Sequence, residues 1–145
     1  GQLVLAGIKA DLESLVDTFK QAGAKRAIVL DMSVASHCEL LLSAVENLKP
    51  YLEEFLNDEF LAVVSNVSTR EYKTKDEAIE LLSAQLVNPV KYKQSITAHE
   101  NKVDLFIEFG NGAVLKGLNK KITKVPTINV SDMNTLEAVI GELND

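Results

Sequence analysis

The side chain best suited to chemistry is that of His37, in the triplet Ser36-His37-Cys38. Imidazole titrates at about pH 6.5, so it can take a proton from a hydroxyl group and return it. The triplet lies where an apolar, strand-like run (residues 27–30) gives way to a helical one (residues 39–56), a corner where α/β enzymes commonly display a catalytic base. The alternative is a structural or surface histidine, with the Ser36 hydroxyl capping the helix. Spacing alone favours this structural alternative.

No convincing nucleophile accompanies His37. The sequence holds no G-x-S-x-G elbow, and the adjacent Cys38 points in a different direction, which favours an inert, partly buried thiol. His99 lies in a polar stretch and is expected to be solvated. Because the two histidines are 62 residues apart and no carboxylates converge on them, we expect no metal site.

Two further features leave alternatives open. Gly110-Asn111-Gly112 stands between a strand and a helix, where N–H groups can bind a phosphate or an oxyanion, but a tight turn with Gly or Asn at positive φ explains it equally well. As a dinucleotide fingerprint it lacks the third glycine. Lys25-Arg26 follows a helix C-terminus, where its charges either complement the helix dipole or bind a phosphate.

Composition bounds the class of protein. The 145 residues are 46% hydrophobic and 25% charged, which is typical of one globular domain. A net charge of −6 argues against nonspecific nucleic-acid binding, although local basic groups, at Lys25-Arg26 and at Lys116, Lys120, Lys121 and Lys124, leave room for a phosphate or an acidic partner. Apolar runs are too short to span a membrane, no signal peptide is recognised, and a single cysteine fits a reducing cytoplasm.

Strand-like and helix-like patterns alternate along the chain. Strands are predicted at residues 3–5, 26–30, 60–64, 105–109 and 126–130. Helices are predicted over residues 12–22 (ended by Gly23), 41–55 (kinked or split at Pro50), 79–86 (after a Thr74/Glu77 capping box), 92–99, 114–122 and 136–143 (capped by Ser131 or Asp132). The alternation predicts an α/β fold with a mainly parallel sheet, in which the apolar run 60–64 is buried on both faces. The polar segment 68–75 is expected to be a connector.

Five segments carry a resemblance to a known family. They are Gly1–Gly7 (G-Q-hydrophobic-V-hydrophobic-A-G), Gly23–Ala27 (G-A-K-R-A), Ser33–Cys38 (S-V-x-S-H-C), Gln85–Val90 (Q-L-x-N-P-V) and Glu108–Leu118 (E-x-G-P-G-x-V-L-x-G-L). In this order and at these separations they resemble the malonyl-CoA:acyl-carrier-protein transacylases of bacterial type II fatty-acid synthesis. The resemblance spans essentially the whole chain but only the C-terminal half or so of the family's. Asn111 stands where the family has a proline, and Tyr92 stands where it has a tryptophan. Both replacements are tolerable.

The resemblance implies transfer of malonyl from CoA to the phosphopantetheine thiol of acyl carrier protein through a malonyl–serine ester, with no cofactor besides the substrate malonyl-CoA. His37 falls on the family's general base, and Gln85 on the residue whose backbone carbonyl orients that base. Lys25 and Arg26 fall where the family meets phosphopantetheine or the carrier protein. The serine, in a G-H-S-L-G elbow, precedes the point where this chain begins. The chain alone is therefore expected to be inactive and to need the missing N-terminal half as its partner.

The resemblance also implies a domain arrangement. Residues 1–31 are expected to form part (β-α-β) of a ferredoxin-like subdomain, and residues 32–145 the later part of a large α/β hydrolase-like domain with a parallel sheet. A cytoplasmic protein with neither a nucleic-acid nor a membrane partner is expected. The rival interpretation is a self-contained, non-catalytic α/β module that binds CoA or a protein partner.

Overall fold

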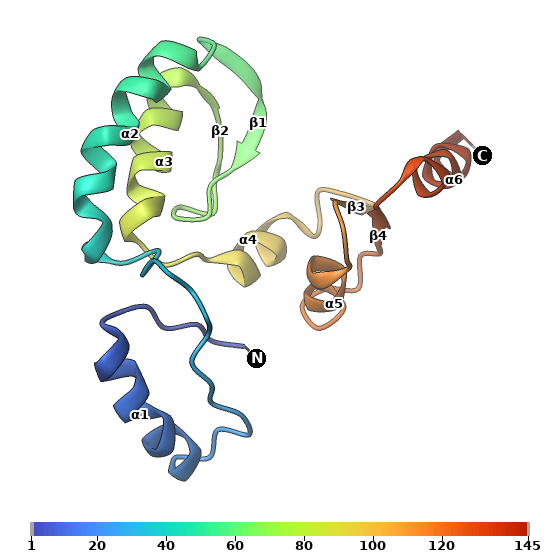
Figure 1. Cartoon of the computed structure of the whole chain (residues 1–145). Helices are drawn as coiled ribbons and strands as arrows, with labels where there is room; N and C mark the ends of the chain where they lie inside the picture. The colour runs from blue at the N-terminus through green and yellow to red at the C-terminus, as the bar shows by residue number, and fades with distance from the viewer. Residues whose placement is uncertain (1, 145) are drawn as a thin grey trace. The chain divides into compact units, whose positions relative to one another are not determined.

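The computed structural model describes residues 2–144 and divides into two compact units, Gly1–Val90 and Lys91–Asp145. Helices and strands alternate in both units, so the predicted α/β class is confirmed (Figure 1). The elements of the first unit are α1 (Lys9–Gln21), the 3-10 helix η1 (Glu39–Leu41), α2 (Leu42–Phe55), β1 (Glu59–Val64), β2 (Glu71–Thr74) and α3 (Lys75–Val87). Those of the second are α4 (Tyr92–His99), β3 (Phe106–Phe109), α5 (Val114–Asn119), β4 (Thr127–Val130) and α6 (Met133–Asn144). The predicted boundary at residues 31/32 stays a prediction.

In the first unit, an antiparallel hairpin and two helices pack together. β1 pairs with β2 in a register that sets Val64 opposite Glu71, and α3 contacts both β2 and α2 (Figure 1). Tyr72 and Ala78 are buried in this core, and the Tyr72 ring meets Phe60 edge-on at 6.0 Å between centroids. Since β2 runs directly into α3, the hairpin fixes where that helix starts.

In the second unit, β3 and β4 form a parallel pair connected through α5. The register sets Phe106 opposite Thr127 and Phe109 opposite Val130, while α5 and α6 both contact β4. Buried Asn119 joins the elements, because its Oδ1 accepts a hydrogen bond from the Tyr92 hydroxyl (2.8 Å) and its Nδ2 donates to Thr127 Oγ1 (3.0 Å). The Tyr92 hydroxyl thus has a polar partner within the second unit.

Helix ends follow the local sequence largely as predicted, except that the Thr74 side chain of the expected capping box makes no hydrogen bond to the N–H groups of α3. Gly23 has φ +98°, and the N–H groups of Gly23 and Ala24 donate to the carbonyls of Lys20 and Phe19, a Schellman end of α1. At α3, Glu77 accepts hydrogen bonds from the Thr74 hydroxyl (2.8 Å) and the Lys73 N–H (3.3 Å). Pro50 lies inside α2, which stays one helix rather than splitting in two.

Asp132 caps α6, since its Oδ1 accepts the Thr135 N–H at 2.8 Å. Hydrogen bonds lower the pKa of both capping carboxylates, Glu77 and Asp132. The Thr74 hydroxyl bond lowers the pKa of Glu77, and the Thr135 N–H bond lowers that of Asp132.

Several strand predictions are wrong. Residues 3–5 and 26–30 form no strand, because a strand needs a neighbour for its N–H and C=O groups and these runs pair with no other described segment. The run 60–64 is not buried on both faces, since Leu61 is 91% exposed. The segment 68–75 contains β2, so one of the two sheets is antiparallel rather than the whole being mainly parallel. No helix in the described part of the chain is both long and apolar enough to cross a membrane.

Candidate active site

His37 has an unusual backbone conformation. It lies in the loop between α1 and η1 with φ +63°, in the left-handed region that few residues other than glycine adopt. For an L-residue this conformation costs about 1–2 kcal/mol. Such strain persists where surrounding structure holds it, and it is frequent at functional sites.

The imidazole of His37 is held by a residue 48 positions away. Its Nδ1 lies 2.8 Å from the main-chain oxygen of Gln85, and the side chain is half-buried. A carbonyl oxygen can only accept a hydrogen bond, so Nδ1 must carry the proton. In the neutral ring, Nε2 then has a free lone pair and is the atom able to take a proton from a substrate or a nucleophile.

The Gln85 carbonyl is available because α3 ends just beyond it. The last four carbonyls of a helix have no partner within the helix, and α3 ends at Val87. Asn88 donates from Nδ2 to the Ala84 carbonyl (2.8 Å), and His37 takes the next carbonyl along. A helix C-terminus also favours a cation, by about 0.3–1 kcal/mol at an exposed site. The His37 ring therefore lies at the end of α3 where the helix carries partial negative charge.

Asn66 belongs to the same cluster and was not among the predicted residues. Its Nδ2 donates to Gln85 Oε1 at 3.2 Å, and both side chains are half-buried. Asn66 follows β1 by two positions. Polar residues just beyond the carboxyl end of an apolar strand are common in α/β binding sites, and this pattern was the available signal.

The structure favours the inert interpretation of Cys38. The thiol is half-buried and donates to the Ala35 carbonyl at 3.3 Å. It bonds to the backbone of its own loop, which is a structural role.

The helix that follows the glycine turn already has a carboxylate partner within the chain. Gly110 and Gly112 have φ +129° and +89°, in accord with the tight-turn alternative. The Glu108 carboxylate accepts the Leu115 and Lys116 N–H groups, each at 2.9 Å. Two N–H groups at the start of α5 are thus occupied by a carboxylate of the chain itself.

His99 is buried, so the prediction that it is solvated is wrong. It is only 8% exposed, and its Nδ1 lies 2.9 Å from the Ser95 carbonyl, one turn earlier in α4. The helix turns this side chain inward although its neighbours in sequence are polar. Among residues 2–144 no group of three His, Cys, Asp or Glu side chains is placed to hold a metal ion.

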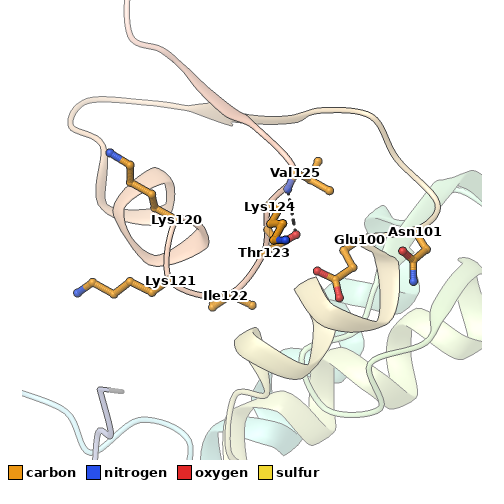
Figure 2. A pocket seen from close by; sticks show the side chains of 8 residues that line it. All are labelled: Glu100, Asn101, Lys120, Lys121, Ile122, Thr123, Lys124 and Val125. Atoms are coloured by element: carbon orange, nitrogen blue, oxygen red, sulfur yellow. Dashed lines mark hydrogen bonds between the residues drawn. The ribbon is translucent and has the colours of Figure 1, made fainter.

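The predicted basic residues are all exposed, and three of them, Lys116, Lys120 and Lys124, line one hollow of about 190 Å³ in the second unit. Lys25 and Arg26 lie on the loop after α1, and neither forms an ion pair within the described part of the chain. In the second unit, a hollow of about 570 Å³ is lined by Glu100, Asn101 and residues 120–125. Figure 2 shows the side chains of Lys120 and Lys121 extending away from Glu100 and Asn101. Lys124 also lines the hollow, so three lysines and one acidic residue, Glu100, surround it.

Comparison with known proteins identifies the proteins that this chain resembles. No protein-family model matches the chain. A malonyl CoA-acyl carrier protein transacylase of Bacillus subtilis is 39% identical over 148 residues, a match that covers 100% of this chain and 47% of the relative. The chain is homologous to the C-terminal portion of malonyl CoA-acyl carrier protein transacylases.

Solved structures of transacylases agree with this. The Helicobacter pylori enzyme matches with a TM-score of 0.92 and 43% identity, over 96% of this chain and 45% of that one. The malonyl-transacylase PlMCAT, solved in complex with the type II PKS acyl-carrier protein AntF, matches with a TM-score of 0.86 and 33% identity, over 94% and 45%. The chain thus spans about half the length of the transacylases it matches.

Proposed function

We propose that this chain is the C-terminal portion of a malonyl-CoA:acyl-carrier-protein S-malonyltransferase of fatty-acid synthesis and carries its general base. The homology to transacylases along the whole chain supports the activity. The observation that carries the proposal is the 2.8 Å contact of His37 Nδ1 with the Gln85 carbonyl, which leaves Nε2 as the base.

The proposed reaction has two acyl transfers. In the first, His37 Nε2 takes the proton of a serine hydroxyl supplied by a part of the enzyme outside this sequence, as the serine oxygen attacks the thioester carbonyl of malonyl-CoA. The C–S bond breaks, the CoA sulfur takes the proton from His37, and a malonyl–serine ester remains. In the second, the phosphopantetheine thiol of the carrier protein gives its proton to His37 and attacks the ester. The serine oxygen then leaves with that proton.

Gln85 acts in both steps through its carbonyl, which keeps Nδ1–H oriented and stabilises the imidazolium formed in each. Lys25 and Arg26 are proposed to bind phosphate groups of the substrate or acidic side chains of the carrier protein. Their exposure and lack of an ion pair in the described residues fit this role, and opposite charge accelerates association. Residues 1–31 and 32–145 are proposed to belong to a ferredoxin-like and an α/β hydrolase-like part, respectively.

Exposed apolar side chains support a fragment over the rival self-contained module. Leu3 is 93% exposed, Leu61 91% and Phe109 72%. Large apolar side chains in such positions are typical of surfaces that another part of a protein covers. The proposed cover is the N-terminal half of the enzyme, and co-expression of the two halves is expected to yield a stable complex.

Rapid acylation of the full-length enzyme by radiolabelled malonyl-CoA tests the function. His37→Ala is expected to slow ester formation by about 10²–10⁴-fold, as loss of a general base does. An unchanged rate would refute the assignment of the base. The 145-residue chain alone, which serves as control, is expected to acquire no ester-linked label. Stable labelling of that chain would refute the claim that the nucleophile lies outside it.

A further inference from the structure

We propose that Asn66 is a positioning residue for the base, acting on His37 through Gln85. This inference rests on the proposed function. One residue makes both contacts, because the Gln85 main-chain oxygen accepts from His37 Nδ1 (2.8 Å) and its side-chain Oε1 accepts from Asn66 Nδ2 (3.2 Å). Asn66 therefore reaches the imidazole through a single intervening residue.

The segment that carries Asn66 is a rigid tight turn. Buried Ser65 closes it, since its N–H donates to the Arg70 carbonyl and its own carbonyl accepts from Thr69 N–H, both at 2.9 Å. The Ser65 hydroxyl oxygen also accepts the N–H groups of Val67 and Ser68, each at 3.1 Å. The pairing of Val64 with Glu71 joins this turn to the hairpin. Asn66 is thus presented from a fixed frame.

Gln85, by contrast, lies in a part of the helix that needs an anchor. It is in the last turn of α3, two residues before the helix ends, where helices fray. Its carbonyl points to His37 only while that last turn keeps its position. The bond from Asn66 ties the turn to the hairpin, so losing it should let the carbonyl, and with it Nδ1–H, move away from the productive orientation.

The placement of His37 makes the effect selective. His37 is held in a left-handed conformation on a loop, and its imidazole is oriented by the Gln85 carbonyl, the one hydrogen bond recorded for this ring among the described residues. Small displacements of a reacting group reduce the rate of a chemical step far more than they reduce substrate binding. The proposal therefore predicts a loss in kcat and in the acylation rate, with KM nearly constant.

A double-mutant cycle in the full-length enzyme tests this. Asn66→Ala removes the donor, whereas Gln85→Ala removes the acceptor but keeps the carbonyl that holds His37. Each single variant is expected to slow single-turnover acylation by about ten- to a hundredfold. The double variant is expected to be no slower than the slower single one, because both changes delete the same bond. Asn66→Asp is expected to recover most of the rate, since the Gln85 amide can rotate and donate to the carboxylate.

The matched control is Asn57→Ala, the same change at an exposed position before β1, where the wild-type rate is expected. The proposal is overturned if Asn66→Ala acylates within about twofold of wild type, if the single effects multiply in the double variant, or if the change falls on KM. Should Asn66→Ala fail to fold, a wild-type rate in Gln85→Ala overturns it instead. His37→Ala in the same series separates the two claims: a normal rate there refutes the proposed function, whereas a slow His37→Ala beside a normal Asn66→Ala refutes only this inference.

Discussion

The two units each hold one histidine, and the two are held in opposite ways. His99 bonds through Nδ1 to a carbonyl four residues earlier in its own helix and is buried. His37 bonds through Nδ1 to a carbonyl 48 residues away, is half-buried, and adopts a positive φ. A bond within one helical turn forms wherever that helix forms. A distant bond combined with backbone strain needs the whole unit to be folded around it.

One helix end of the first unit has a partner from a distant part of the chain. In the second unit, Glu108 accepts two N–H groups in the first turn of α5 and Asp132 accepts one in the first turn of α6, and both carboxylates are close to these N–H groups in sequence. In the first, a carbonyl of the last turn of α3 is taken by His37, from a distant loop. That carbonyl therefore keeps its partner only while the first unit is folded.

Replacing each histidine in turn with asparagine is expected to give the largest difference between the two positions, and that difference is in kcat. Asn tolerates the left-handed region, so His37→Asn removes the base with little change to the backbone. In the full-length enzyme we expect it to lower kcat by about 10²–10⁴-fold. His99→Asn, which leaves that site untouched, is expected to keep kcat within about twofold. Steady-state assays of malonyl transfer measure kcat of both variants. Equal losses of kcat would contradict the expected difference between the two histidines.

Stability should show the reverse order. His99→Asn shortens a buried side chain and is expected to lower the free energy of unfolding by about 1–3 kcal/mol. His37→Asn, at a half-buried loop position, is expected to change it by less than about 0.5 kcal/mol. Urea unfolding followed by circular dichroism measures the difference, and a larger loss at His37 would contradict it.

A sharper comparison substitutes glycine and alanine at each position. At His37, where φ is +63°, glycine relieves strain, and we expect His37→Gly to be more stable than His37→Ala by about 1 kcal/mol. At His99, inside α4, the sign should reverse by up to about 1 kcal/mol, because glycine weakens a helix. If His37→Ala were as stable as His37→Gly or more stable, the left-handed backbone of His37 would carry no strain.

The smallest effect concerns pH and the two capping carboxylates, Glu77 and Asp132. Hydrogen bonds lower the pKa of each, from ordinary values of 4.5 and 3.8, so folding favours the charged form. The stability they contribute is complete above those ordinary values and is lost as pH falls through the lowered ones. Glu77→Gln and Asp132→Asn should each make stability fall less steeply in that acidic range, as urea midpoints at a series of pH values would show. An unaltered slope in both variants would contradict the capping role.

The features that could be predicted from the sequence are those set by interactions between residues a few positions apart in the chain. Gly23, Glu77 and Asp132 were predicted correctly because each acts on a helix end a few residues away. The strand β2 was missed because its pairing with β1, not its polar composition, makes it a strand. Asn66 was missed for the same kind of reason, since its partner lies 19 residues away. Spacing alone favoured a structural His37, and only resemblance to a family paired it with Gln85.

The tautomer of His37 tests the central claim most directly. Nitrogen NMR of the full-length enzyme with labelled histidine, assigned against His37→Asn, reports which ring nitrogen carries the proton when the ring is neutral. A hydrogen bond from Nδ1–H to the Gln85 carbonyl requires the Nδ1–H tautomer, with Nε2 unprotonated and able to act as the base. A neutral ring protonated at Nε2 would contradict the account, because that nitrogen could not take the proton of a nucleophile.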